Sequence, residues 1–175
     1  MRQMLSRMLV AGMIISALVA WALPAVASAA TVPTKNEQAV IDLVNAERTK
    51  RDLPALVVSE ILVRSARGHS TQMANKKYFS HDSYNGESFS KRIIRYGYTR
   101  SGYSSWRVGE DIAWGTNIFS TPVAIVQSWM GSSAHRAVIL DPKVKELGVG
   151  RAFTSSFKGQ QNVTLYTLDT GARTK

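Results

Sequence analysis

The stretch ELGVGRAFTSSFKGQQNVTLYTLDTG, residues 146–171, decides the fold class. Apolar and polar residues alternate around Val149 and again at Val163, Leu165 and Thr167. A period of two is typical of β-strands, and the polar KGQQ between the two runs favours a turn. We therefore expect an antiparallel hairpin in this part of the chain.

The segments before this hairpin have the period of helices. Thr34 and Glu37 are spaced as a capping box, and apolar residues at helical spacing continue towards Pro54. Ser59 is expected to cap a second helix that runs to about Asn75.

Two shorter helices are expected further along the chain. One covers SFSKRIIRYG at residues 88–97 and ends at Gly97, and the other starts after Thr121, with Pro122 in its first turn. Residues 98–115 are expected to be mostly irregular, with a short apolar element at the end. Several helices followed by a small sheet predict an α+β layered domain.

Residues 1–29 have the pattern of an export signal. Arg2 and Arg7 precede an uncharged apolar run at residues 9–23, and small residues at 27–29 form a cleavage site. The run is shorter than the roughly 20 residues that span a bilayer. We therefore expect a cleaved signal rather than an anchor, no transmembrane span after cleavage, and a secreted or periplasmic protein. A short tail at 30–35, a domain at 36–171 and a C-terminal tail at 172–175 would follow.

The composition narrows the possible chemistry and partners. The 175 residues carry 22 Lys and Arg against 12 Asp and Glu, a net charge of +10, and include no cysteine. Disulfides and thiolate chemistry are therefore excluded. The basic residues are scattered without interleaved aromatic residues, which makes nucleic acid an unlikely partner. Lys91, Arg92 and Arg95 are interpreted as part of a solvated helix face, with anionic envelope polymers or lipid head groups as the alternative partners.

The chain has three histidines, and they differ in their surroundings. His69 lies on the apolar stripe of the second expected helix, which indicates a structural role. His81 lies in a polar loop beside Asp82. His135 lies in SWMGSSAHRAVIL, residues 128–140, near the start of a new apolar turn. There the positive end of a helix dipole would keep its imidazole neutral, as a metal ligand or proton acceptor.

Glu110 is the candidate carboxylate. In RVGEDIAWG, residues 107–115, it lies between a glycine and apolar residues, which indicates a fixed position at the edge of the core. The alternative is a surface acid paired with Arg107 or Arg136. The sequence contains no local metal motif and no G-x-S-x-G nucleophile elbow. The residues alone thus give two histidines and a glutamate that could converge.

Several segments together resemble a known family. LVNAERTKRDLPAL (43–56), the segment from His69 to Tyr98, VGEDIAWG (108–115), SWMGSSAHRAVILDPKVKELGVG (128–150) and YTLDTG (166–171) are similar to the CAP superfamily, also called the SCP domain. Its members include cysteine-rich secretory, antigen five and pathogenesis-related-one proteins. The resemblance covers about residues 36–171, and the bacterial members are the most similar in style.

This resemblance implies a three-layer α-β-α sandwich with a small antiparallel sheet and an open cleft. In the family the cleft is lined by two histidines and acidic residues, and several members hold zinc there. His81, Glu110 and His135 match those positions and are the candidate metal ligands and catalytic residues. Ser132 stands where many eukaryotic members have a second glutamate. Asp111 replaces the usual asparagine, which would raise a carboxyl pKa or strengthen cation binding.

Two functions remain open at this point. The first is an exported domain whose cleft binds a ligand, with Ser132 and Asp111 among the contacts and with or without zinc or another divalent metal. The second is a metal-assisted, peptidase-like hydrolase acting on an envelope or extracellular substrate, so enzymatic activity is left undecided. The ligand would be a lipid, glycan or protein of the envelope or exterior, and no organic cofactor is expected.

Overall fold

The computed structural model describes residues 31–175. The predicted export signal lies outside these residues. Within the described part of the chain, no helix combines the length and the apolar character needed to cross a bilayer.

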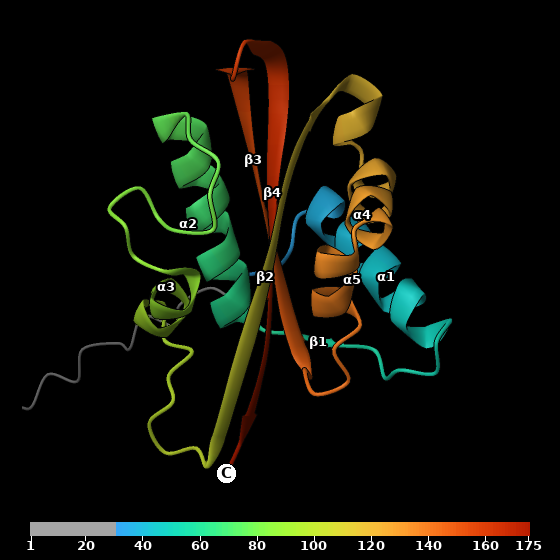
Figure 1. Ribbon diagram of the computed structural model, residues 1–175, viewed down its shortest axis with the longest axis vertical. Helices are drawn as coiled ribbons and strands as arrows, with labels where there is room; N and C mark the ends of the chain where they lie inside the picture. The colour runs from blue at the N-terminus through green and yellow to red at the C-terminus, as the bar shows by residue number, and fades with distance from the viewer. Residues whose placement is uncertain (1–30) are drawn as a thin grey trace, which may run out of the picture.

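Helices cover both faces of one sheet, which confirms the predicted α-β-α sandwich (Figure 1). Five α-helices and one 3-10 helix are present among the described residues. On one face lie α2 (Glu60–Lys76) and α3 (Phe89–Arg95). The other face carries α1 (Lys35–Thr49), α4 (Pro122–Gly131) and α5 (Ser133–Ile139), and the 3-10 helix η1 (Asn117–Ser120) leads into α4.

The sheet has four strands in the order β1-β3-β4-β2. These are β1 (Val57–Val58), β2 (Ser105–Thr116), β3 (Glu146–Phe157) and β4 (Gln160–Thr174). The predicted hairpin is present as β3 and β4. The sheet is mixed rather than wholly antiparallel, because the short β1 pairs with β3 in parallel. Residues 172–174, assigned to a tail from the sequence, continue β4.

The expectation of an irregular segment at residues 98–115 is wrong for its second half. Ser105–Thr116 forms β2, which pairs with β4 along its whole length. Trp106, Val108 and Ile112 pack on the side of α2 and α3. The residues that face the other side of β2 include Gly109 and Asp111, which are not large apolar residues. The segment therefore shows only a weak form of the apolar pattern that predicts a buried strand.

The expected start of α1 is confirmed by its hydrogen bonds. The Thr34 N–H donates to Glu37 Oε2 at 2.7 Å, as in a capping box. The main apolar cluster lies between the sheet and the helices α1, α4 and α5. Its largest members are fully buried: Trp129, Tyr166, Ile41, Ile125 and Ile139.

Two glycines of β3 set the position of α2. A Cβ atom at Gly148 would lie 2.1 Å from the Val63 nitrogen, and one at Gly150 would lie 2.0 Å from the Arg67 nitrogen. Only glycine allows the helix backbone to approach the strand this closely. The helix that carries His69 is therefore seated directly on the sheet.

Candidate functional site

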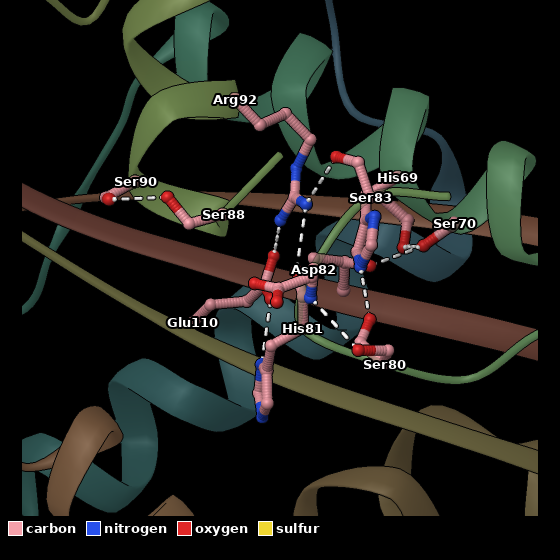
Figure 2. Close-up of polar contacts among 12 residues, drawn as sticks. His69, Ser70, Ser80, His81, Asp82, Ser83, Ser88, Ser90, Arg92 and Glu110 are labelled. Carbon is pink, nitrogen blue, oxygen red and sulfur yellow. Dashed lines mark hydrogen bonds and ion pairs between the residues drawn. The ribbon is translucent and has the colours of Figure 1, made fainter. Parts of the chain in front are cut away.

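The loop between α2 and α3 carries His81, and two buried side chains hold that loop in place (Figure 2). His69 Nε2 lies 2.9 Å from the Ser80 carbonyl oxygen. Arg92 Nη1 donates to the His81 carbonyl oxygen at 3.0 Å and to Ser83 Oγ at 3.2 Å. The backbone on both sides of the His81 peptide is thus fixed to the helix layer.

Arg92 is 2% exposed, so its assignment to a solvated helix face is wrong. Its guanidinium points inward from α3 and also donates, through Nη2, to Glu110 Oε2. A buried arginine is tolerated because carbonyl, hydroxyl and carboxylate oxygens receive its N–H groups. Sequence reasoning missed this residue because its partners lie on the loop and on β2.

Glu110 is the centre of the cluster. Its side chain is completely buried and projects from β2 towards α2 and α3. Oε1 lies 2.8 Å from His81 Nδ1, and Oε2 accepts from Arg92. The alternative partners do not pair with it, because Arg107 contacts Asp141 and Arg136 donates to the Met130 carbonyl.

A second carboxyl group lies opposite Glu110 across the strand pair. Asp169 on β4 is fully buried, and neither of its carboxyl oxygens has a hydrogen-bond partner within residues 31–175. Burial, followed by the charge of Glu110, raises the pKa of Asp169 well above its usual value. Burial also raises the pKa of Glu110 to about 7, although the Arg92 charge opposes this shift. Two facing carboxyl groups with one guanidinium therefore retain at least one proton at neutral pH.

Asp169 was not identified from the sequence as a site residue. It lies in the closing YTLDTG segment, whose similarity to the CAP superfamily was noted without a role for this residue. Its position opposite Glu110 depends on strand pairing between segments that are far apart in the chain.

His81 presents one ring nitrogen outward. Burial, followed by the charge of Arg92, lowers the pKa of His81, so its imidazole is neutral at pH 7. With Glu110 ionised, Nδ1 donates to the carboxylate and the lone pair lies on Nε2. The side chain is 49% exposed, which leaves this nitrogen available to a ligand.

His135 is the third residue of α5 and is partly exposed. Burial, followed by the charge of His81, lowers the pKa of His135. No hydrogen bond joins His135 to His81 or Glu110 among the residues described. Ser132, also partly exposed, immediately precedes α5 as its N-cap residue.

Asp111 does not join these groups. Adjacent strand residues point to opposite faces, so Asp111 projects towards α1, α4 and α5. Its partner in the strand pairing, Leu168, belongs to the main apolar cluster. Asp111 is 0% exposed, and neither carboxyl oxygen has a partner within the described residues. Burial, followed by the charge of Glu110, raises its pKa to about 8, so its carboxyl group is mainly protonated at pH 7.

The predicted three-ligand set of His81, Glu110 and His135 is not assembled around one point in the structure. Across residues 31–175, no three His, Asp or Glu side chains are placed to hold one ion together. Both oxygens of Glu110 are already engaged, by His81 and Arg92. A carboxylate that accepts from the second nitrogen of a histidine is typical of groups that orient a metal-binding imidazole. Glu110 therefore fits the role of orienting His81.

His69 has the structural role expected from the sequence. It is completely buried, and burial followed by the charge of Arg92 lowers its pKa to about 3. The imidazole therefore remains neutral and donates from Nε2 to Ser80. It supports the His81 loop from within the fold.

Two curated proteins of Bacillus subtilis are similar to this chain. The uncharacterized protein YkwD of Bacillus subtilis (strain 168) is 38% identical over 125 residues, covering 71% of this chain and 46% of that protein. The uncharacterized membrane protein YlbC of the same organism is 32% identical over 130 residues, covering 72% and 35%. The chain thus spans less than half the length of these curated relatives.

Solved structures show the same architecture. An extracellular protein containing a SCP domain from Bacillus anthracis has a TM-score of 0.62 at 31% identity, covering 80% of this chain and 40% of that chain. An outer surface protein from Borrelia burgdorferi has a TM-score of 0.63 at 19% identity, covering 81% and 96%, and shows the fold. The sequence model of the CAP, or cysteine-rich secretory protein, family matches residues 41–167. This chain, although it has no cysteine, therefore belongs to the cysteine-rich secretory protein family.

Proposed function

We propose that this protein is an exported CAP domain that binds a ligand at the surface formed by His81 and His135, with a divalent cation such as zinc held between the imidazoles. The observation that carries the proposal is the 2.8 Å contact between His81 Nδ1 and Glu110 Oε1. It fixes the ring so that Nε2 faces outward, which is the state a metal or a hydrogen-bond donor requires. Export is supported by the extracellular SCP-domain protein that this chain resembles.

The arrangement favours binding over hydrolysis. A bound zinc ion would polarise a ligand oxygen or lower the pKa of a bound water. A hydrolase would also need a free carboxylate or imidazole as general base. Glu110 is occupied by His81 and Arg92, and Asp111 lies on the other side of the sheet. Neither Glu110 nor Asp111 is therefore placed to act as a general base on a ligand at His81.

Calorimetric titration with zinc tests the proposal. We expect His81→Ala and His135→Ala each to weaken zinc binding by at least tenfold, because each removes one of two donors. Glu110→Gln should weaken it by about tenfold or more through loss of ring orientation. Asp42→Asn is the control, since it changes an exposed side chain of α1 and should leave affinity unchanged. Unchanged zinc affinity in both alanine variants would refute the site.

The pH dependence gives a second measurement. Both imidazoles have lowered pKa values, so they remain neutral to a lower pH than an ordinary histidine with a pKa of 6.5. Zinc binding should therefore persist at pH 6.5 and weaken as the solution becomes more acidic. Loss of binding already above pH 7 would contradict neutral, preoriented histidines.

A further inference from the structure

The start of β2 and the end of β4 pair with each other near the C-terminus (Figure 1). A basic cavity of about 390 Å³ lies beside these paired strand ends and the segment that precedes β3. Three cationic side chains line it, and no acidic residue does: Arg107, Lys143 and Lys145. The hydroxyl groups of Ser105 and Thr174 add hydrogen-bond donors to the wall.

The two lysines of this cavity have no acidic partner within residues 31–175. Both are exposed, and neither ammonium group forms an ion pair or hydrogen bond there. Arg107 differs, because its Nη1 lies 3.0 Å from Asp141 Oδ2. Unpaired cations on a concave wall produce a positive potential that attracts anions.

A second cavity of about 410 Å³ shares Lys145 with the first. Its other lining residues are Val57, Tyr103, Glu146 and Arg173. The Arg173 guanidinium lies 4.0 Å from the centre of the Tyr98 ring and 4.8 Å from that of Tyr103. This stacking fixes the cation, and its Nε has no hydrogen-bond partner among the described residues.

We propose that the cavity lined by Arg107, Lys143 and Lys145 binds a phosphate-bearing polymer. Lysine and arginine bind phosphate oxygens through charge-assisted hydrogen bonds. This cavity is much larger than one phosphate ion, so it has room for more than one phosphate group of a chain. Arg173 precedes Thr174 in β4 and therefore faces the other side of the sheet, so the second cavity is separate. This site is independent of the proposed surface at His81 and His135.

The structure favours a soluble polymer over a membrane surface as the source of phosphate. Proteins that dock on bilayers insert apolar side chains beside their basic residues. None of the exposed large apolar side chains in residues 31–175 lines the cavity of Lys143 and Lys145. Concave walls with cations and hydroxyl groups suit a flexible anionic chain.

Fluorescence anisotropy with labelled linear polyphosphate tests this inference on protein expressed from its full sequence. We expect the double variant Lys143→Gln/Lys145→Gln to weaken binding about 25-fold at low salt, on the order of fivefold for each lysine. The matched control Lys35→Gln/Lys91→Gln removes two exposed lysines that line neither cavity and should change affinity less than about threefold. Far-ultraviolet circular dichroism confirms that each variant is folded.

Binding to lipid vesicles distinguishes a soluble polymer from a membrane surface as the source of the phosphate groups. We expect weak binding to phosphatidylcholine vesicles, with or without phosphatidylglycerol, relative to polyphosphate. Equal losses in the two double variants, or no polyphosphate binding at all, would overturn the proposal. Tight binding to the phosphatidylglycerol vesicles that depends on Lys143 and Lys145 would replace the polymer with a membrane.

Discussion

Replacing Asp111 with asparagine should stabilise the protein, and the gain should grow with pH. The wild-type carboxyl group is completely buried without a hydrogen-bond partner in residues 31–175. It resembles an amide in shape, and asparagine is the usual residue here in the CAP superfamily. Asp111→Asn therefore keeps the volume of the side chain and replaces the titratable carboxyl group with an amide that does not ionise.

The size of the effect follows from proton linkage. The pKa of Asp111 is raised from an ordinary 3.8 to about 8 in the folded protein. Between these values the folded state binds a proton that the unfolded state has lost, so stability falls as pH rises. The loss is about 1.4 kcal/mol for each pH unit and reaches on the order of 4 kcal/mol at pH 7. The asparagine variant does not lose this stability, because its side chain does not ionise.

Urea unfolding followed by tryptophan fluorescence measures this directly. The free energy of unfolding of Asp111→Asn minus that of the wild type should be small at pH 4 and should rise up to about pH 8. Asp42→Asn on the exposed side of α1 is the control and should leave the difference constant. Parallel stability curves for Asp111→Asn and the wild type between pH 5 and pH 8 would refute a buried, protonated Asp111.

Three other changes test the packing around the site. In the wild type the pKa of His69 is about 3 in the folded state, so below pH 6.5 only the unfolded chain takes up a proton at this residue. The free energy of unfolding should therefore fall by about 1.4 kcal/mol per pH unit below pH 6.5, and His69→Gln should remove this dependence. Urea unfolding at pH 4 and pH 7 measures the difference. Arg92→Met should cost about 3–5 kcal/mol by leaving Glu110 buried without its cation, seen as a lower melting temperature. Gly150→Ala should cost at least about 2 kcal/mol by pressing against the α2 backbone, whereas Gly131→Ala, with no atom within 4 Å, should not destabilise.

The helices and the hairpin could be predicted because their signals are local. Thr34 and Glu37 lie three residues apart, and the alternation in β3 and β4 lies within each strand. The strand β2 was missed because its signal is not local. Its polar central residues are buried through contacts with α3 and β4, so the segment lacks the apolar alternation of an ordinary strand.

The candidate site was predicted in part. His81 and Glu110 were identified by resemblance, and the structure brings them into contact. Arg92 and Asp169 were missed, since a charged residue in an isolated segment looks solvated unless its partner is known. Asp111 was expected among the ligand contacts because it follows Glu110, but neighbouring residues of a strand face opposite ways.

The direct seating of α2 on β3 has a mechanical consequence. At Gly148 and Gly150 the backbone of α2 lies directly against that of β3, which opposes sliding of the helix along the strand. We therefore expect the His81 loop to move together with the sheet. If the site changes shape when a ligand binds, we expect the change in the short helix α5. Ligand binding should then alter amide hydrogen exchange in α5, while the amides of α2 stay protected.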